Sequence, residues 1–189
     1  MRTNLKEKVA LVTGASSGLG ARFARVLAAN GALTVLAARR LERLKDLRAE
    51  IEAAGGAADM VALDVTEQVS IEAAVEQTER EVGPIDILVN NSGVSTAQRL
   101  TEATPVDYDF MFDTNVKGAF FVAQAVARRM IARSKQQQGL RGRIVNIASI
   151  AGLRVLPDIG VYCMTKAAVI HMTRSQAVEW GRYGINVNA

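Results

Sequence analysis

Tyr162 and Lys166 have the side chains and the spacing for proton transfer at an oxygen atom. They stand four residues apart in a stretch with helical periodicity, and this separation places both on one face of a helix. An ammonium group beside a phenol favours the phenolate, so the tyrosine can release and take back a proton. Ser149 follows an apolar run typical of a strand, and its hydroxyl can hydrogen-bond a reacting carbonyl. Together these residues predict acid–base chemistry on a carbonyl or an alcohol.

A glycine-rich turn predicts a phosphate site. Residues 13–20 read TGASSGLG and lie between an apolar run and a stretch with helical periodicity. Glycines carry no Cβ, so backbone N–H groups and the positive end of the helix can approach a phosphate. The GxxxGxG spacing differs from the common GxGxxG pattern, so an ordinary tight turn is the alternative. The favoured interpretation is a nucleotide ligand held by Gly14, Ser16, Ser17, Gly18 and Leu19.

The second predicted strand ends in Arg39 and Arg40, with no acidic residue at its tip. In dinucleotide sites an acid at this point binds the ribose hydroxyls of NAD, whereas an arginine binds the 2′-phosphate of NADP. A guanidinium offers forked donors and a permanent charge that suit a phosphate. We therefore predict NADP(H) as the preferred cofactor and NAD(H) as a possible one. The alternative is an arginine pair that simply begins a solvent-exposed helix.

Short β-branched runs alternate with longer amphipathic stretches, a pattern typical of βαβ units around a parallel sheet. Helices are expected over 41–51, 71–82, 107–133 and 162–183, and residues 133–143 are expected to form a solvent-exposed loop. The first, fourth and fifth predicted strands are nearly continuous apolar runs, which indicates burial on both faces. The predicted strands are 9–13, 33–37, 60–63, 85–90, 143–148 and 185–189.

Composition excludes several classes of protein. The net charge is only +4 and aromatic residues make up 5% of the chain, so a nucleic-acid surface is not expected. No apolar run approaches the roughly 20 residues of a membrane span. One cysteine, one histidine and a polar start predict no disulfide, no metal centre and a cytoplasmic location.

In this order along the chain, these motifs resemble the short-chain dehydrogenase/reductase family: the glycine turn, an Asn-Asn-Ser-Gly run at 90–93, Asn115, Ser149 and Tyr162-x-x-x-Lys166. The segments 142–149 and 184–189 are similar to bacterial 3-oxoacyl-carrier-protein reductases and to assorted carbonyl reductases and alcohol dehydrogenases. The resemblance implies one doubly wound α/β domain of the Rossmann type over residues 1–189, with strand order 3-2-1-4-5-6. It also implies that the family's last strand and substrate lid are missing from these residues.

The resemblance further assigns roles to single residues. Tyr162 would be the acid and base, Lys166 would bind the nicotinamide ribose, and Ser149 would polarise the substrate oxygen. Asn115 would hold a water molecule that links Lys166 to solvent, although a structural amide with its hydrogen bonds satisfied is the alternative. The remaining cofactor contacts would be Asp64 and Val65 at the adenine, and Asn91 and Gly93 at the middle of the cofactor.

Three functions follow as hypotheses. The first is an NADPH-dependent 3-oxoacyl or general carbonyl reductase, and the second is an NAD(P)-dependent alcohol or sugar dehydrogenase. The third is a non-catalytic sensor of dinucleotides, which would have no need for the Tyr162–Lys166 pair. The expected partner is a small carbonyl or alcohol substrate. By analogy with the family, the helices over 107–133 and 162–183 would join copies of the chain into a dimer or tetramer.

Overall fold

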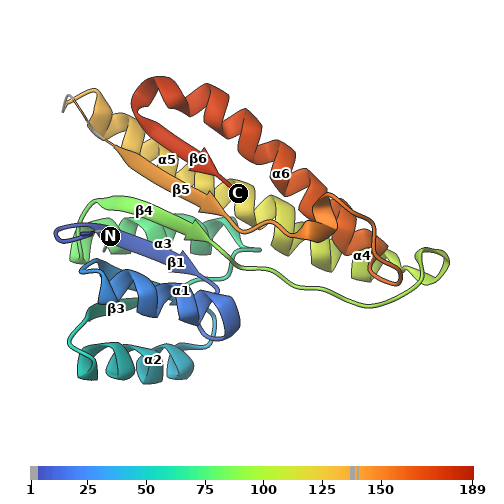
Figure 1. Cartoon of the computed structure of the whole chain (residues 1–189), viewed down its shortest axis with the longest axis horizontal. Helices are drawn as coiled ribbons and strands as arrows, with labels where there is room; N and C mark the ends of the chain where they lie inside the picture. Colours follow the sequence, from blue (N-terminus) through green and yellow to red (C-terminus); the bar gives the residue numbers. More distant parts are fainter. Residues whose placement is uncertain (1–3, 137–138, 140) are drawn as a thin grey trace.

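The protein is built around one parallel sheet of six strands, in the order β3-β2-β1-β4-β5-β6 (Figure 1). The structure is a computed structural model that describes residues 4–136, 139 and 141–189. The predicted fold class and strand order are confirmed. Because all neighbouring strands are parallel, their carboxyl ends gather at one edge of the sheet. The strands are β1 (Val9–Thr13), β2 (Leu33–Ala38), β3 (Ala57–Ala62), β4 (Ile85–Asn90), β5 (Gly142–Asn146) and β6 (Ile185–Asn188).

Two strand predictions are wrong by more than one residue at one end. β3 begins at Ala57, three residues before the predicted start, because its ladder with β2 already begins at the pair Leu33–Ala57. Alanine is a weak strand former, so only the pairing identifies these residues. β5 ends at Asn146, where its ladder with β4 ends opposite Asn90. Ile147 and Ala148, predicted as strand, therefore lie in the loop that leads to Ser149.

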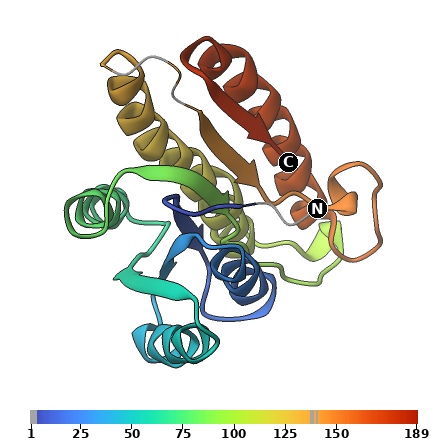
Figure 2. The same ribbon diagram turned by 60° about the vertical axis from the view of Figure 1, so that its left-hand side comes forward.

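Helices cover both faces of the sheet (Figures 1 and 2). One core cluster joins the sheet to α1 (Gly18–Ala29) and α2 (Leu41–Ala53). The other joins it to α3 (Gln68–Glu81) and α5 (Ala119–Ser134), with Ala177 and Trp180 of α6 (Gly160–Trp180) packed against it. Short 3₁₀ turns are formed by Leu100–Glu102, Ile150–Gly152 and Gly181–Tyr183. Within the described ranges, no helix has the length and the apolar character needed to cross a membrane.

Strand β5 alternates between fully buried and half-buried residues within this chain, so its two faces differ in burial. Ile144 on this strand is fully buried in the cluster with α3 and α5, whereas Arg143 and Val145 on its other face are half-buried. The neighbouring strand β6 follows the same alternation, since Ile185 is buried and Asn186 is exposed.

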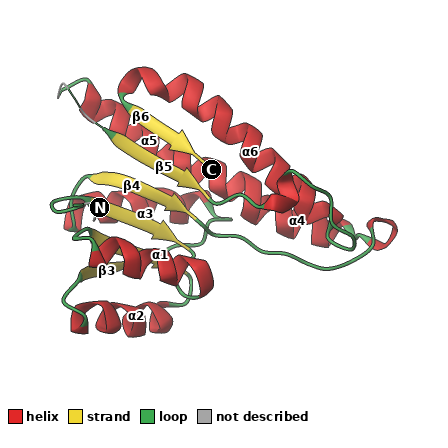
Figure 3. Cartoon of the chain, viewed as in Figure 1, coloured by secondary structure: helices red, strands yellow, loops and turns green. Residues whose placement is uncertain are grey.

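The helix expected over 107–133 is present as one uninterrupted helical run, but it changes type along its length. It consists of α4 (Pro105–Phe112), a π-helical segment (Asp113–Gly118) and α5. Figure 3 shows α4 beyond the edge of the sheet, next to the start of α6. π-Helical turns inside α-helices are uncommon and occur frequently at functional sites. Here the turn contains Asn115, the residue predicted to hold a catalytic water.

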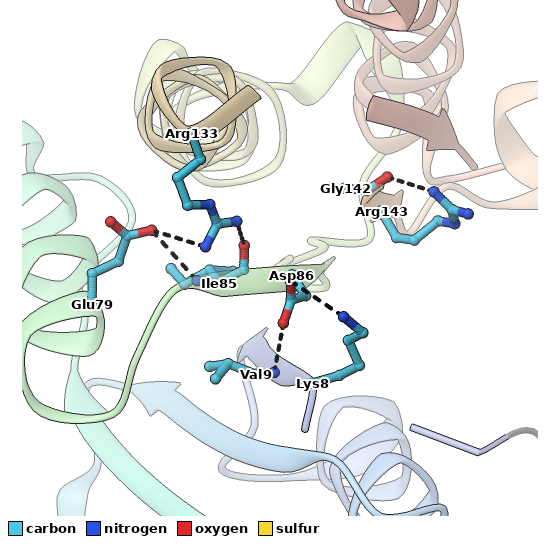
Figure 4. Close-up of polar contacts among 8 residues, drawn as sticks. All are labelled: Lys8, Val9, Glu79, Ile85, Asp86, Arg133, Gly142 and Arg143. Atoms are coloured by element: carbon cyan, nitrogen blue, oxygen red, sulfur yellow. Dashed lines mark hydrogen bonds and ion pairs between the residues drawn. The ribbon is translucent and has the colours of Figure 1, made fainter. Parts of the chain in front are cut away.

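Arg133 connects α5 to the amino end of β4 (Figure 4). It was the shared boundary of the predicted helix 107–133 and the predicted solvent-exposed loop 133–143. In the structure α5 includes it, and its side chain is only 19% exposed. The Nη2 atom donates to the Ile85 carbonyl at 2.5 Å, and Nη1 lies 4.0 Å from the Glu79 carboxylate. β4 pairs with β5 only from Ile87 onwards, so Arg133 supplies a donor before the ladder begins. Of the rest of the predicted loop, residues 137, 138 and 140 lie outside the described residues.

We expect Arg133→Ala to lower the free energy of unfolding by about 1–3 kcal/mol, because it leaves a buried carbonyl without its charged donor. The measurement is urea unfolding at neutral pH. Arg129, on the same helix but exposed, is the matched control, and Arg129→Ala should change stability by less than about 0.5 kcal/mol. Equal stability of the two variants would contradict this role for Arg133.

Candidate active site

A cleft of about 570 Å³ lies at the carboxyl ends of the strands. Such edges are where ligands of open parallel sheets bind. The cleft brings together most of the predicted site residues, although they come from segments far apart in the sequence. Gly18 and Asn115 are the two predicted residues that do not line it. The predicted residues that do are Gly14, Ser16, Ser17, Leu19, Arg39, Arg40, Asp64, Val65, Asn91, Gly93, Ser149, Tyr162 and Lys166.

The turn between β1 and α1 has no room for side chains at two of its glycines. Gly14 has a φ of +65°, and a Cβ there would lie 2.9 Å from the Asn91 amide nitrogen. A Cβ on Gly20 would lie 2.3 Å from the Gly14 carbonyl oxygen. Asn91 also donates from its amide to the Thr13 carbonyl at 3.0 Å, which ties the turn to the end of β4. The close packing fixes the backbone of the turn at the start of α1, where Gly14, Ser16 and Ser17 line the cleft and a phosphate group can bind.

Both arginines after β2 reach the cleft, but they have different partners. Arg40 donates to the hydroxyl groups of Ser16 and Ser17, at 2.9 and 3.2 Å. Its charge therefore lies at the glycine turn. Arg39 lies 3.8 Å from the Asp64 carboxylate. The sequence did not reveal this difference, because the two arginines are adjacent and of the same type.

Asp64 is held as a carboxylate. Partial burial opposes its charge, but hydrogen bonds from the backbone N–H and the hydroxyl of Thr66 outweigh that effect, and with Arg39 they lower the pKa of the carboxyl group. The carboxylate is therefore oriented by its own chain and not only by the arginine. It presents a fixed acceptor at the end of the cleft that carries Arg39.

The start of α6 positions Tyr162 and Lys166. Gln98, in the loop after β4, forms a parallel bridge with Ile159, and its N–H donates to the Asp158 carbonyl at 2.6 Å. Figure 3 shows this loop and the one before α6 running beside each other. The Lys166 ammonium lies 5.6 Å from the centre of the Tyr162 ring. The two side chains are therefore neighbours, as their four-residue spacing predicted.

Lys166 is buried, and its side chain is held by one hydrogen bond. Only 5% of the residue is exposed, and this burial lowers the pKa of its ammonium group. Nζ donates to the Ile147 carbonyl at 2.8 Å. That carbonyl belongs to the loop after β5, two residues before Ser149, whose hydroxyl accepts from the Ala151 N–H at 3.1 Å. The early end of β5 thus supplies the contact that orients Lys166 toward the cleft.

Asn115 lies beside the cleft as a buried amide with several partners. Its Oδ1 accepts from the Val94 N–H at 2.7 Å, and its Nδ2 donates to the Val94 carbonyl at 2.8 Å and to the Thr165 hydroxyl at 3.1 Å. These contacts correspond to the structural alternative. The water-holding role of Asn115 remains a prediction.

A comparison with known protein families covers nearly the whole chain. A sequence model described as short chain dehydrogenase matches residues 8–189. The chain belongs to the short-chain dehydrogenase family. It is therefore an oxidoreductase, as the residues and their order along the chain predicted.

Relatives within the short-chain dehydrogenase family include enzymes named for sugar acids and polyols. Gluconate 5-dehydrogenase of Gluconobacter oxydans (strain 621H) is 44% identical over 179 residues, which are 95% of this chain and 68% of the relative. Sorbitol dehydrogenase of Cereibacter sphaeroides is 45% identical over 185 residues, 98% of this chain and 69% of the relative. A gluconate 5-dehydrogenase from Burkholderia cenocepacia J2315, solved in complex with NADP and tartrate, superimposes with a TM-score of 0.92. It is 40% identical, and the match covers 99% of this chain and 71% of that one.

In this short-chain dehydrogenase, sequence reasoning missed several residues that line the cleft. Ile147 is the most important, because its carbonyl binds Lys166. Its apolar side chain gave no signal, and it was assigned to a strand. The others lie within two residues of predicted ones, and this proximity was the only signal available: Ala38, Leu63, Thr66, Ser92, Val94, Ser95, Thr114 and Ala148. Among the described residues, His, Cys, Asp and Glu form no group of three that could hold a metal ion.

Proposed function

We propose that this chain is a dehydrogenase of polyols or sugar acids that prefers NADP(H). The observation that carries the proposal is one cleft containing the glycine turn, Ser149, Tyr162 and Lys166. The sugar acid and polyol names of the relatives support this substrate class. They favour the alcohol or sugar dehydrogenase hypothesis over the 3-oxoacyl reductase, which was the first expectation.

The proposed mechanism assigns a proton path to the chain's own residues. The Ser149 hydroxyl donates to the substrate oxygen and fixes its position. Tyr162 accepts the hydroxyl proton of an alcohol, or gives a proton to the oxygen of a ketone. The nearby Lys166 ammonium favours the phenolate form of the tyrosine. When bound, a nicotinamide cofactor supplies or accepts the hydride.

The cleft fits a dinucleotide by its shape and by its charges. The crowded contacts at Gly14 and Gly20 hold the backbone of the turn in place at the start of α1, where a pyrophosphate would lie. Lys166 and Tyr162 line the opposite part of the cleft and would hold the nicotinamide ribose. Arg40, which donates to the hydroxyl groups of Ser16 and Ser17, would bind a ribose 2′-phosphate. A relative solved with NADP supports this preference.

Arg40→Ala should lower the preference for NADPH over NADH by roughly tenfold or more, because it removes a charge-assisted contact of about 1.5–3 kcal/mol. Arg39→Ala should have the smaller effect, since the Asp64 carboxylate at 3.8 Å already offsets part of its charge. The measurement is kcat/KM with each cofactor. Equal use of NADPH and NADH by the wild type would refute the role of the arginines.

A substrate panel tests the proposed function. Purified protein is assayed for reduction of NADP⁺ and NAD⁺ with polyols and aldonates, and for oxidation of NADPH with keto acids and 3-oxoacyl thioesters. We expect turnover of a polyol–ketose or aldonate–ketoaldonate pair. Turnover of thioesters alone would favour the reductase hypothesis. Tight NADPH binding without turnover of any substrate would favour the sensor.

We also propose that α5 and α6 join two copies of the chain. A groove of about 820 Å³ lies between them, and its lining includes Phe120 and Trp180. It carries both signs of charge, with Lys117 and Arg128 against Asp113 and Glu179, which suits a self-complementary contact. Sedimentation analysis should give a dimer or a multiple of it, and Phe120→Glu should shift the protein toward the monomer.

A further inference from the structure

Thr165 lies between the two residues of the Tyr162–Lys166 pair and has no exposed surface. Its hydroxyl donates to the Tyr162 carbonyl at 2.8 Å and accepts from Asn115 Nδ2 at 3.1 Å. The hydroxyl therefore acts both as a donor and as an acceptor, and both of its partners are protein groups. The hydroxyl connects the first turn of α6 to the π-helical segment.

Asn115 extends this connection to the loop after β4. Its side-chain amide both donates to and accepts from the backbone of Val94. The neighbouring Gly93 lies close to the pair as well, since a Cβ there would stand 3.6 Å from Lys166 Nζ and 3.3 Å from Asn115 Oδ1. The path Val94–Asn115–Thr165 thus joins one wall of the cleft to the helix that carries the acid–base pair.

The pair is held from two sides. On the side of β5, the Ile147 carbonyl binds Lys166 Nζ. On the side of β4, the only side-chain hydrogen bond from Asn115 to α6 among the described residues is the one to Thr165. Loss of the Thr165 hydroxyl would leave Lys166 anchored at Ile147, whereas the turn that carries Tyr162 would lose its side-chain anchor to Asn115 and keep only the backbone contacts of Gln98 just before α6. Small displacements of a reacting group reduce rates steeply.

We propose that Thr165 is a positioning residue, which fixes the first turn of α6, and with it Tyr162, to Asn115 and the wall of the cofactor cleft. The inference rests on the proposed function, in which Tyr162 transfers the proton. Thr165 itself is buried and does not line the cleft. Its effect is therefore on the chemical step and not on contacts with the substrate.

The chain offers a matched control on the same helix. Thr173 is also buried, its hydroxyl donates to the Val169 carbonyl at 2.7 Å, and it accepts from Asn146 Nδ2 at 3.0 Å. In both cases the asparagine nitrogen keeps a second acceptor, the Val94 carbonyl or Gln176 Oε1. The variants Thr165→Val and Thr173→Val therefore remove the same kinds of bond, the first between α6 and the π-helical segment and the second between α6 and β5.

We expect Thr165→Val to lower kcat at least about tenfold, with KM and the NADPH dissociation constant changed no more than about twofold. Thr165→Ser should restore kcat to within about twofold, because serine keeps the hydroxyl. Thr173→Val should keep the wild-type kcat while its Tm falls by about as many degrees as that of Thr165→Val. Equal kcat losses in the two valine variants, or a wild-type kcat in Thr165→Val, would overturn the proposal.

Amide hydrogen exchange tests Thr165 without turnover, so failure of the proposed function can be told apart from failure of this inference. In the cofactor-free protein, Thr165→Val should speed exchange in the segment 160–168 at least about tenfold, because local opening no longer breaks the Asn115 contact. Thr173→Val should speed exchange only later in α6. Unchanged exchange over 160–168 in Thr165→Val would overturn the proposal even if no substrate is found.

Discussion

Tyr162→Phe should lower kcat by about 10²–10⁴-fold, the usual contribution of a positioned acid or base. Phenylalanine keeps the ring and removes only the hydroxyl group that would transfer the proton. NADPH should still bind within about threefold of the wild-type affinity, because the glycine turn and the arginines are unchanged. The measurements are single-turnover hydride transfer and a fluorescence titration with NADPH.

Tyr183→Phe is the control for this prediction, since Tyr183 lies in the 3₁₀ turn after α6 and packs against the core cluster with α3 and α5. It should keep the wild-type kcat. Retained turnover in Tyr162→Phe would assign the proton transfer to another group. Loss of both turnover and NADPH binding would indicate a structural role for the Tyr162 hydroxyl.

Gly20→Ala should weaken NADPH binding at least about tenfold and destabilise the protein by about 1–3 kcal/mol, the usual cost of overpacking. The added Cβ would meet the Gly14 carbonyl oxygen at 2.3 Å and the Asn91 amide nitrogen at 2.6 Å. The first of these is backbone, so relief requires movement of the turn itself. The measurements are a fluorescence titration with NADPH and urea unfolding.

Gly181→Ala is the matched control, because a Cβ at Gly181 would meet no atom within 4 Å. We expect this variant to keep both the stability and the cofactor affinity of the wild type. If Gly20→Ala bound NADPH as tightly as the wild type, the turn between β1 and α1 would not be the phosphate site. The proposed cofactor site would then have to be placed elsewhere.

The local parts of this protein could be predicted from the sequence. Tyr162 and Lys166 share a helical face because the period of the helix is a property of the backbone. The glycine turn is equally local, since the absence of a Cβ permits its conformation whatever surrounds it. The order of strands and helices followed from periodicity and from the resemblance to the family, and strand order is confirmed.

Contacts between distant segments were decided only by the tertiary structure. The pairing with β4 ends β5 before Ile147, and this leaves a carbonyl for Lys166. The two adjacent arginines have different partners, because Arg39 lies near Asp64 whereas Arg40 lies near the hydroxyl groups of the glycine turn. Thr165 binds Asn115, 50 residues away along the chain. A buried polar group must find a partner, but which group is within reach depends on how the helices and strands pack.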